Sequence, residues 1–482
     1  MKRVCSWRSL QRALGINVQS FHSTTMAQLG QPCHATHPDI IGKMEVTPRI
    51  TQEEYRSRRI KLANAIRSYD EQRDHVVIIP SHDRSYMSAG VPFIYRQHSN
   101  MTYLTGFLEN ESALVMNIDK SGHTSTLFVK EHTEQENLWE GERSGRAGAL
   151  EHTAIDDTDN IKNLELHLLS SLHADSLVWY NKTTPISRTL HEKYLLPFLA
   201  RVSPAHLRNA DSAVDRLRLF KSPAEEDLMR KCGDLTAEMF METMRFSVDN
   251  PHEHALFAKF DYECRIKGAS NLAYLPVIAG GSNALAVHYI RNDRHIDKDS
   301  MVLVDCGCDL HGYVSDVTRT WPVSGKFSSA QKEMYEAVEE VYKSCLHFCQ
   351  PGVYSLNDIF SVMMALIGQQ LERLGIVTSS ISNDELSKLV QKMCPHHVGH
   401  WLGMDVHDTP TVSRSMKLQP HQVICIEPGL YFGKDDQRVP KEMRGVGIRI
   451  EDNILITENG YENLNTMLPT SVKEIESLLN DD

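Results

Sequence analysis

The pattern of apolar and polar positions divides the chain into two stretches with different organisation. In the first, Thr51 and Glu54 have the spacing of a capping box, and the apolar residues after them at helical intervals predict a helix. Short β-rich runs follow and alternate with helical stretches near 160–172 and 186–199. The predicted strands are residues 76–79, 113–118, 126–129 and 177–180. This alternation predicts an α/β domain over residues 45–205.

The second stretch opens with a strong helix start. Ser222 supplies a capping hydroxyl, proline follows at the first helical position, and Glu225 stands at the third. An apolar stripe continues from this start at Leu228, Cys232, Leu235 and Met239. Farther on, the pattern predicts strands at 302–304, 423–426 and 448–456, and helices near 328–348 and 355–374. Strands and helices without strict alternation predict an α+β domain over residues 211–475.

Residues 1–40 have a composition of their own. No acidic residue occurs before Asp39, serine and threonine are frequent, and a helix would place Leu10, Leu14 and Val18 on one face. The basic residues are Lys2, Arg3, Arg8 and Arg12. This composition predicts a disordered mitochondrial transit peptide and import to the matrix, while a cytoplasmic form stays open. A basic tail without a targeting role is the alternative, and a secretory signal lacks the required apolar core.

Composition narrows the class of protein. The 482 residues include 51 basic and 63 acidic side chains, a net charge of -12, which argues against broad nucleic-acid binding because that needs concentrated positive charge. No apolar run approaches the roughly 18 residues of a membrane span, and no glycine-rich phosphate loop is present. The ten cysteines form no paired motif, which predicts buried, reduced thiols.

Two aspartates lie on a predicted hairpin. Apolar runs around Asp305 and Asp316 are joined by a turn-forming segment, residues 309–312. If the turn is centred between Leu310 and His311, the two carboxylates lie opposite each other, with Cβ atoms roughly 5 Å apart. They then repel each other unless two divalent cations, roughly 3.5–4 Å apart, are bound between them. Two solvated aspartates are the alternative, which Asp305 makes difficult because it interrupts an apolar strand.

Histidines and glutamates farther along the chain extend this set. His396, His397, His400 and His407 lie close together in a segment spaced by glycines, although each alone could have a structural role. Glu427 ends an apolar run, and Glu451 shares a strand face with Arg449, where a surface ion pair is the alternative. The candidate ligands are Asp305, Asp316, His400, Glu427 and Glu451. Oxygen-rich sites with one nitrogen favour Mn²⁺ or a similar hard divalent ion.

This ordered set, in its local sequence context, resembles the pita-bread metallopeptidases, which include aminopeptidase P, prolidase, methionine aminopeptidase and the metal-free creatinases. Residues 396–408 resemble the signature of the aminopeptidase P and prolidase branch, and residues 99–106 resemble the N-terminal domain of aminopeptidase P. His397 departs from the pattern, because many members have a small residue there. The resemblance implies an α+β pita-bread catalytic domain preceded by an α/β creatinase-type N-terminal domain.

The resemblance also implies an activity and a set of roles. The expected reaction removes an N-terminal residue that precedes proline, by a hydroxide bridging two divalent ions, with Mn²⁺ as the expected metal. The five candidate ligands would hold the ions, and Glu427 would also transfer a proton. His288 and His407 match residues that hydrogen-bond the developing oxyanion. His396 and Tyr274 match positions near the substrate pocket, where a structural role is equally open. Arg449 is expected to steady Glu451.

Partners and alternatives follow from the same resemblance. The expected substrates are peptides or proteins with proline at position two, and the expected assembly is a homodimer. A prolidase, which acts on Xaa-Pro dipeptides, is the alternative enzyme. A metal-free pita-bread binding module is an alternative of another class, although all five ligand types are present.

Overall fold

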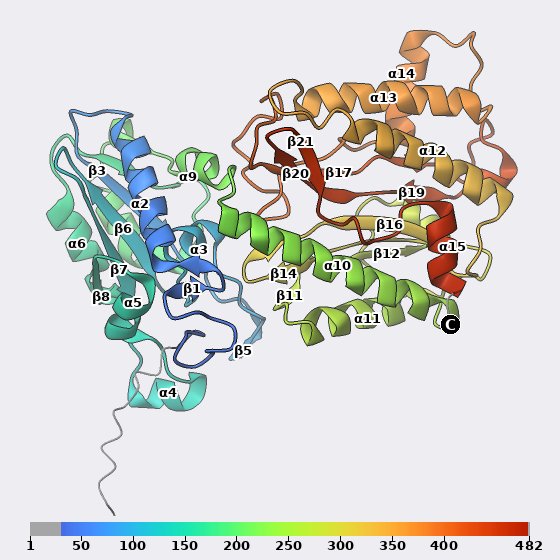
Figure 1. Cartoon of the computed structure of the whole chain (residues 1–482). Coiled ribbons are helices and arrows are strands. Elements are labelled where there is room, and N and C mark those ends of the chain that lie inside the picture. Colours follow the sequence, from blue (N-terminus) through green and yellow to red (C-terminus); the bar gives the residue numbers. More distant parts are fainter. Residues whose placement is uncertain (1–29, 481–482) are drawn as a thin grey trace, which may run out of the picture.

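The computed structural model describes residues 30–480 and has two lobes, which lie side by side in Figure 1. Most of the predicted transit peptide, residues 1–29, lies outside the described residues. Its last part does not match the expected disorder, because Gln31 and Cys33 are buried against the N-terminal lobe. The Gln31 amide donates to the carbonyl of Gly106 at 2.9 Å. Gln31 and Cys33, which composition assigned to the leader, are therefore part of the packed lobe.

The N-terminal lobe is built on a six-stranded mixed sheet with the order β10-β9-β3-β6-β7-β8. Its strands are β3 (His75–Pro80), β6 (Ala113–Ile118), β7 (His123–Val129), β8 (Asp157–Asn160), β9 (Leu177–Trp179) and β10 (Leu207–Arg208). The predicted capping residue, Thr51, accepts the amide of Glu54 at 3.2 Å and starts α2. The helices are α2 (Gln52–Arg67), α3 (Ser99–Thr105), α4 (Glu134–Glu140), α5 (Gly145–Thr153), α6 (Leu164–Ser171), α7 (Arg188–Leu190) and α8 (Leu196–Leu199). Two short hairpins complete the lobe: β1 (Glu45–Thr47) with β2 (Ile50–Thr51), and β4 (Tyr86–Ser88) with β5 (Val91–Pro92).

The C-terminal lobe follows α9 (Asp211–Arg218) and consists of antiparallel strands covered by long helices. Its sheets have the orders β11-β14-β15, β12-β13-β16, β17-β20-β21 and β18-β19. The strands are β11 (Asn271–Leu272), β12 (Val277–Gly280), β13 (Met301–Cys306), β14 (Cys308–Leu310), β15 (Tyr313–Val314), β16 (Val317–Pro322), β17 (Val423–Ile426), β18 (Gly429–Tyr431), β19 (Gly447–Arg449), β20 (Asp452–Thr457) and β21 (Gly460–Asn463). The helices are α10 (Pro223–Asp249), α11 (Glu253–Ile266), α12 (Ser329–Leu346), α13 (Leu356–Arg373), α14 (Asn383–Met393) and α15 (Val472–Asn480).

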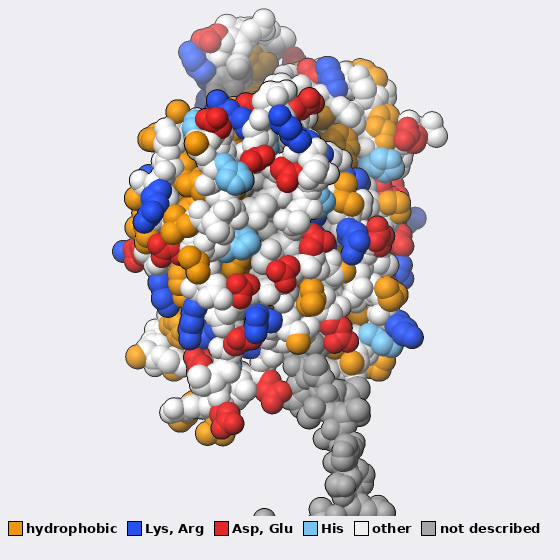
Figure 2. Space-filling model, turned by 90° about the vertical axis from the view of Figure 1, so that its left-hand side faces the viewer, with side chains coloured by type: hydrophobic (Ala, Val, Ile, Leu, Met, Phe, Trp, Pro, Cys, Tyr) orange, Lys and Arg blue, Asp and Glu red, His pale blue; other side chains and the backbone are white. Residues whose placement is uncertain are grey.

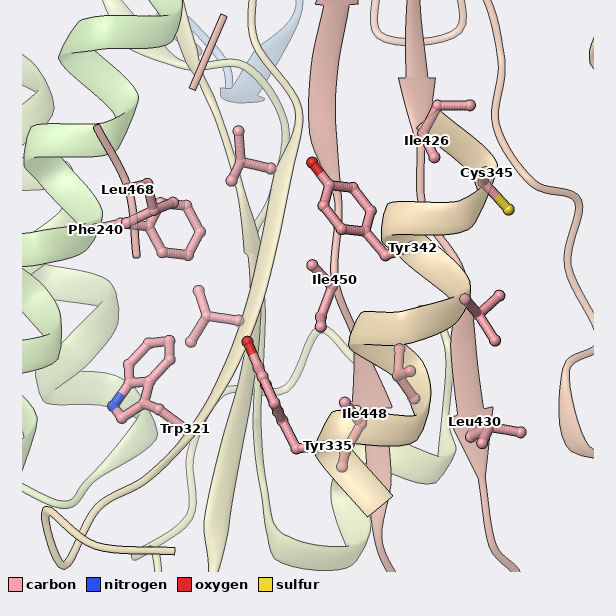
Figure 3. Packing of buried hydrophobic residues seen from close by; sticks show 14 of the residues in the cluster. Phe240, Trp321, Tyr335, Tyr342, Cys345, Ile426, Leu430, Ile448, Ile450 and Leu468 are labelled. Atoms are coloured by element: carbon pink, nitrogen blue, oxygen red, sulfur yellow. The ribbon is translucent and has the colours of Figure 1, made fainter. Parts of the chain in front are cut away.

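The main core of this lobe lies on both sides of its strands (Figure 3). Phe240 of α10 and Trp321 of β16 pack edge to face with ring centroids 6.5 Å apart, and both are fully buried. On the other side, Tyr335 and Tyr342 of α12 pack toward Ile448 and its neighbours. Strand residues alternate between the two faces of a sheet, and here apolar side chains point to the helix layers on both faces. The polar site residues therefore lie near the ends and interruptions of the strands.

The register of the hairpin differs from the one expected. The turn is centred between His311 and Gly312, one residue later than assumed, because Leu310 pairs with Tyr313. His311 and Gly312 have φ values of 56° and 86°, the left-handed geometry of a two-residue hairpin turn. Asp305 consequently pairs with Thr318 and not with Asp316. Moving the turn by one residue shifts every cross-strand partner by two residues.

The other sequence predictions for this lobe need one correction. The expected strand 448–456 is two strands, β19 and β20, and Glu451 lies at the break between them. The Ser222 capping box is present at the start of α10. Within residues 30–480 the nine cysteines are free and buried, in agreement with the prediction of reduced thiols.

The outer face of the N-terminal lobe has a mixed surface (Figure 2). Acidic and basic side chains alternate there with scattered apolar ones, so charge of one sign is not concentrated on this face. Within the part of the chain that the structure describes, no helix combines the length and apolar character needed to cross a bilayer.

Candidate metal centre

The five candidate ligands come from separate parts of the C-terminal lobe. Asp305 is on β13, and Asp316 lies directly before β16. His400 is in the segment after α14, Glu427 lies between β17 and β18, and Glu451 lies between β19 and β20. An isolated backbone bridge between Thr318 and Glu451 joins the β16 region to the last two of these strands. The candidate ligands thus lie near the ends of strands or at breaks between them.

A compact buried group forms the centre of the site. Ligand atoms of Asp316, His400, Cys425 and Glu451 all lie within 4.8 Å of one another. His400 Nε2 is 3.3 Å from Asp316 Oδ2, while His400 Nδ1 is 3.1 Å from the carbonyl oxygen of Trp401. Because a carbonyl only accepts, Nδ1 carries a proton, which leaves Nε2 as the nitrogen that faces the carboxylates and could bind a metal once it has lost its proton. That neutral form is the tautomer that a metal ligand requires.

The two remaining candidates border this group. The Tyr274 hydroxyl lies within hydrogen-bond distance of both Asp305 and Asp316, at 2.5 Å from Asp316 Oδ1. Asp305 Oδ2 accepts the guanidinium of Arg449 at 2.6 Å. Glu427 Oε1 is 3.8 Å from His400 Nε2. The structure therefore brings all five predicted residues to one site, although Asp305 and Asp316 are not opposite each other on the strands.

Burial makes this group of carboxylates electrostatically costly. It raises the pKa of Asp305 to about 6 and the pKa of Glu427 to about 7. Burial and the charge of Asp316 raise the pKa of Glu451 well above its ordinary value. Burial alone would lower the pKa of His400, but Asp316 and Glu427 raise it to about 9. Four carboxylates facing one imidazole and one guanidinium leave excess negative charge, which bound cations would neutralise.

One atom tests whether the site fits a metal ion. Glu451 is 2% exposed, its Oε2 accepts the Thr318 hydroxyl at 2.7 Å, and its Oε1 is buried without a hydrogen-bond partner among the described residues. A buried carboxyl oxygen without a partner is unfavourable by itself. An oxygen-rich donor set with one imidazole suits a hard divalent cation, so the residues fit the predicted group.

The predicted substrate-side residues lie around this centre. The His407 ring packs edge to face on His400 with centroids 4.5 Å apart. Burial lowers the pKa of His396 to about 4, and its Nε2 lies 2.9 Å from the Tyr431 hydroxyl. His288 is exposed, and it is close enough for its charge to contribute to the lowered pKa of His396 and of His407, where burial is the largest cause. The Tyr274 hydroxyl contacts the carboxylates of Asp305 and Asp316 directly.

His397, the residue that departs from the family pattern, contacts a surface helix. Its ring stacks on Phe360 of α13 with centroids 4.5 Å apart, and its Nε2 lies 3.3 Å from the Asn357 side chain. These contacts join the histidine-rich segment to α13 and do not involve the candidate ligands.

The sequence predicted that Arg449 steadies Glu451, but it did not predict the other residues that orient the ligands. Arg449 reaches Glu451 through the Thr318 hydroxyl, which accepts its Nε at 3.0 Å. Asn453 fixes the backbone on both sides of Asp316, since its side-chain oxygen accepts the Asp316 amide at 3.2 Å and its amide donates to the Asp316 carbonyl. Strand alternation could have indicated that Cys425 lies at the site, because it stands two residues before Glu427 and therefore on the same face.

The pKa shifts predict how metal binding depends on pH. The pKa of Asp305 and of Glu427 is higher in the folded, metal-free protein than in the unfolded chain. Above about pH 4.5 the folded protein therefore binds protons that the unfolded chain has released, and the contribution of these two groups to folding stability declines as pH rises toward 7. Cations compete with these protons. We therefore expect the rise in Tm on adding Mn²⁺ to be larger at about pH 7.5 than at about pH 5.5.

The difference between metal-loaded and metal-free protein is the quantity to measure. Buried neutral histidines such as His98, with a pKa lowered to about 3, change the absolute stability in the opposite direction, and they contribute to both forms. Thermal melts after chelation, with and without Mn²⁺, give this difference. An equal or smaller rise in Tm at the higher pH contradicts the assignment.

The fold and this ligand set are typical of a metal-dependent hydrolase, and comparisons with known proteins specify the family. Residues 227–458 match Metallopeptidase family M24, and residues 55–179 match the Aminopeptidase P, N-terminal domain. Xaa-Pro aminopeptidase 3 of Mus musculus is 41% identical over 480 residues, which cover 97% of this chain and 94% of that protein. Intermediate cleaving peptidase 55, mitochondrial, of Arabidopsis thaliana is 37% identical, with coverage of 98% and 92%.

A solved structure agrees with these sequence matches. The crystal structure of Icp55 from Saccharomyces cerevisiae superimposes with a TM-score of 0.81 at 32% identity, covering 91% of this chain and 99% of that one. The chain therefore belongs to metallopeptidase family M24. The predicted fold class, a pita-bread catalytic domain after an aminopeptidase P N-terminal domain, is confirmed.

Proposed function

We propose that this protein is a metal-dependent aminopeptidase that removes the N-terminal residue of peptides with proline at position two. The observation that carries the proposal is the buried group around Asp316, His400 and Glu451, in a chain 41% identical to an Xaa-Pro aminopeptidase. Residues 45–205 would form the N-terminal domain and residues 211–475 the catalytic domain.

The metal ligands in this proposal are Asp305, Asp316, His400, Glu427 and Glu451. Two divalent ions bound there would lower the pKa of a water molecule enough to supply a nucleophile near neutral pH. Mn²⁺ is the proposed metal, because four carboxylates and one imidazole form a hard donor set. Arg449 holds Asp305 at 2.6 Å and reaches Glu451 through Thr318, so it keeps two of these carboxylates oriented.

The remaining chemistry is assigned to side chains at the edge of the site. Glu427, with a pKa raised by burial to about 7, would move a proton from the attacking water to the departing nitrogen. His407 and His288 would donate hydrogen bonds to the oxyanion that develops on the scissile carbonyl. Partial burial and the charge of His400 lower the pKa of His407, which supports a neutral donor at pH 7. His396 and Tyr274 would border the bound peptide.

A panel of peptides tests the proposed activity. We expect the Mn²⁺-loaded protein to hydrolyse Xaa-Pro tripeptides and longer peptides faster than matched peptides with alanine at position two. Faster cleavage of Xaa-Pro dipeptides would indicate a prolidase. Equal or faster cleavage of the alanine peptides would contradict the proposed preference for proline. Absence of both metal binding and hydrolysis would favour the alternative that the protein is a metal-free binding module.

We also propose that the protein acts in mitochondria, in the matrix. The acid-poor leader supports this, as does a relative that is named mitochondrial. Because Gln31 is packed against the N-terminal lobe, we place the cleavage before it. A fusion of residues 1–45 to a fluorescent protein should enter mitochondria and become shorter. A full-length fusion confined to the cytosol contradicts the proposal.

A homodimer remains part of the proposal. The β4–β5 hairpin exposes a group of apolar side chains, and such groups are typical of surfaces that associate. They are Tyr86, Met87, Val91, Phe93 and Ile94. Light scattering on the purified protein measures the mass of the assembly.

A further inference from the structure

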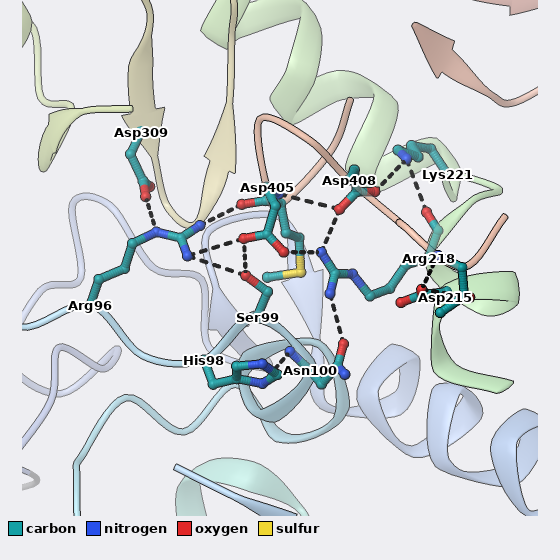
Figure 4. Close-up of polar contacts among 12 residues, drawn as sticks. Arg96, His98, Ser99, Asn100, Asp215, Arg218, Lys221, Asp309, Asp405 and Asp408 are labelled. Carbon is teal, nitrogen blue, oxygen red and sulfur yellow. Dashed lines mark hydrogen bonds and ion pairs between the residues drawn. The ribbon is translucent and has the colours of Figure 1, made fainter. Parts of the chain in front are cut away.

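We propose that Arg96, in the N-terminal lobe, is a positioning residue for the loop of the other lobe that carries His407. The inference rests on the proposed role of His407. The observation behind it is a network of ion pairs and hydrogen bonds between the two lobes, which Figure 4 shows. Arg96 lies just before α3, far in sequence from every candidate catalytic residue.

Arg96 joins two segments of the catalytic lobe with one side chain. Its Nε donates to Asp309 Oδ2 at 3.0 Å, in the hairpin that leads to Asp316. Its Nη1 donates to Asp405 Oδ1 at 3.3 Å, and its Nη2 donates to the carbonyl of Met404. The planar guanidinium thus holds the hairpin and the His407 loop in a fixed relation, which a single-point ammonium could not do.

The loop itself is anchored on both sides of His407. Two residues before it, Asp405 also accepts the Ser99 hydroxyl at 2.6 Å and Arg218 Nη2 at 2.6 Å. One residue after it, the buried Asp408 accepts Arg218 and, at 3.3 Å, Lys221. With its neighbours held by charge-assisted hydrogen bonds, the His407 ring has little freedom to leave its contact with His400.

The packing of the loop leaves little space for rearrangement. A Cβ added to Gly403 would lie 2.5 Å from Asp408 Oδ2 and 2.8 Å from Lys221 Nζ. Asp408 also donates its backbone amide to the carbonyl of Trp401 at 3.0 Å. The side facing the N-terminal lobe is different, because there the loop is held by side chains of another domain, chiefly Arg96 and Ser99. Loss of that contact should therefore loosen the loop without collapsing it.

Arg96 is the residue of this network that can be replaced without unfolding the protein. Arg218 is only 4% exposed and balances two carboxylates, so removing it would strand buried charge. The Arg96 side chain is 40% exposed and that of Asp405 is 37% exposed, so water can solvate that carboxylate after substitution. Asp309, whose side chain is 9% exposed, still accepts the amide of Gly312 at 2.9 Å. Arg49 provides a matched control: it also joins the lobes, by a pair with Asp227 at 2.9 Å, and its side chain is 44% exposed.

The experiment compares Arg96→Met, Arg49→Met, His407→Ala and the double variant Arg96→Met/His407→Ala. We expect Arg96→Met to lower kcat about tenfold, with a smaller change in KM and an unchanged metal content, because the ligands stay in place. Arg49→Met should keep wild-type kcat. If Arg96 acts through His407, adding Arg96→Met to His407→Ala should produce no further loss.

The outcomes separate this inference from the proposed function. Wild-type kcat in Arg96→Met, or losses that multiply in the double variant, overturns the positioning role even when His407→Ala is impaired. Loss of metal in Arg96→Met also overturns it, since Arg96 would then act through the Asp309 hairpin. Wild-type kcat in His407→Ala removes His407 from the mechanism and the inference with it. Absence of hydrolysis by the wild-type protein refutes the proposed function itself.

Discussion

Replacing Asp316 by Asn is expected to abolish turnover while leaving the protein folded. Asp316 is the carboxylate nearest the centre of the site, 3.3 Å from His400 Nε2 and 2.5 Å from the Tyr274 hydroxyl. Asn keeps the shape and removes the charge, so the second ion should bind weakly. A bound metal contributes several kcal/mol to transition-state stabilisation, and each 1.36 kcal/mol is a factor of ten. We expect a loss of about 10³-fold or more.

The measurements are metal stoichiometry, Tm and turnover on one preparation. Asp261→Asn is the control, because it makes the same chemical change on the surface of α11, where Asp261 pairs with Arg265 at 3.0 Å. That variant should keep both metals and full activity. Near-normal hydrolysis by Asp316→Asn with two metals bound would refute the dinuclear assignment.

Replacing His407 by Ala is expected to lower kcat and kcat/KM together by about 10²–10³, or roughly 3–4 kcal/mol. The competing interpretation is that His407 only stabilises the turn before Pro410. In the structure Asp408 serves that purpose, since its amide donates to Trp401 and its carboxylate accepts Arg218 and Lys221. The His407 ring instead faces His400. Metal content should barely change, because His400 supplies the imidazole ligand.

His254→Ala is a suitable control, since it removes an exposed histidine from the first turn of α11. A His407→Ala protein with a lower Tm but wild-type turnover per folded molecule would support the structural interpretation and remove His407 from the mechanism.

Local signals in the sequence determined much of the fold. The capping box at Ser222 and the side-chain cap at Thr51 depend on residues three apart, so both helix starts could be predicted. The strand 423–426 is an apolar run bounded by polar residues, and it is found at those residues. The candidate ligands could be chosen because a carboxylate that interrupts or ends an apolar strand is costly unless something binds it.

Only the tertiary structure decided how these residues meet. The hairpin register depended on one turn residue, and the left-handed His311–Gly312 turn moved Asp305 from Asp316 to Thr318. The contact of Tyr274 with both aspartates joins segments whose proximity no local pattern specifies. Arg96 meets Asp405 across 309 positions in the sequence. The chemistry of each side chain is a local property, whereas distances between them follow from the packing of whole sheets and lobes, which composition and periodicity do not encode.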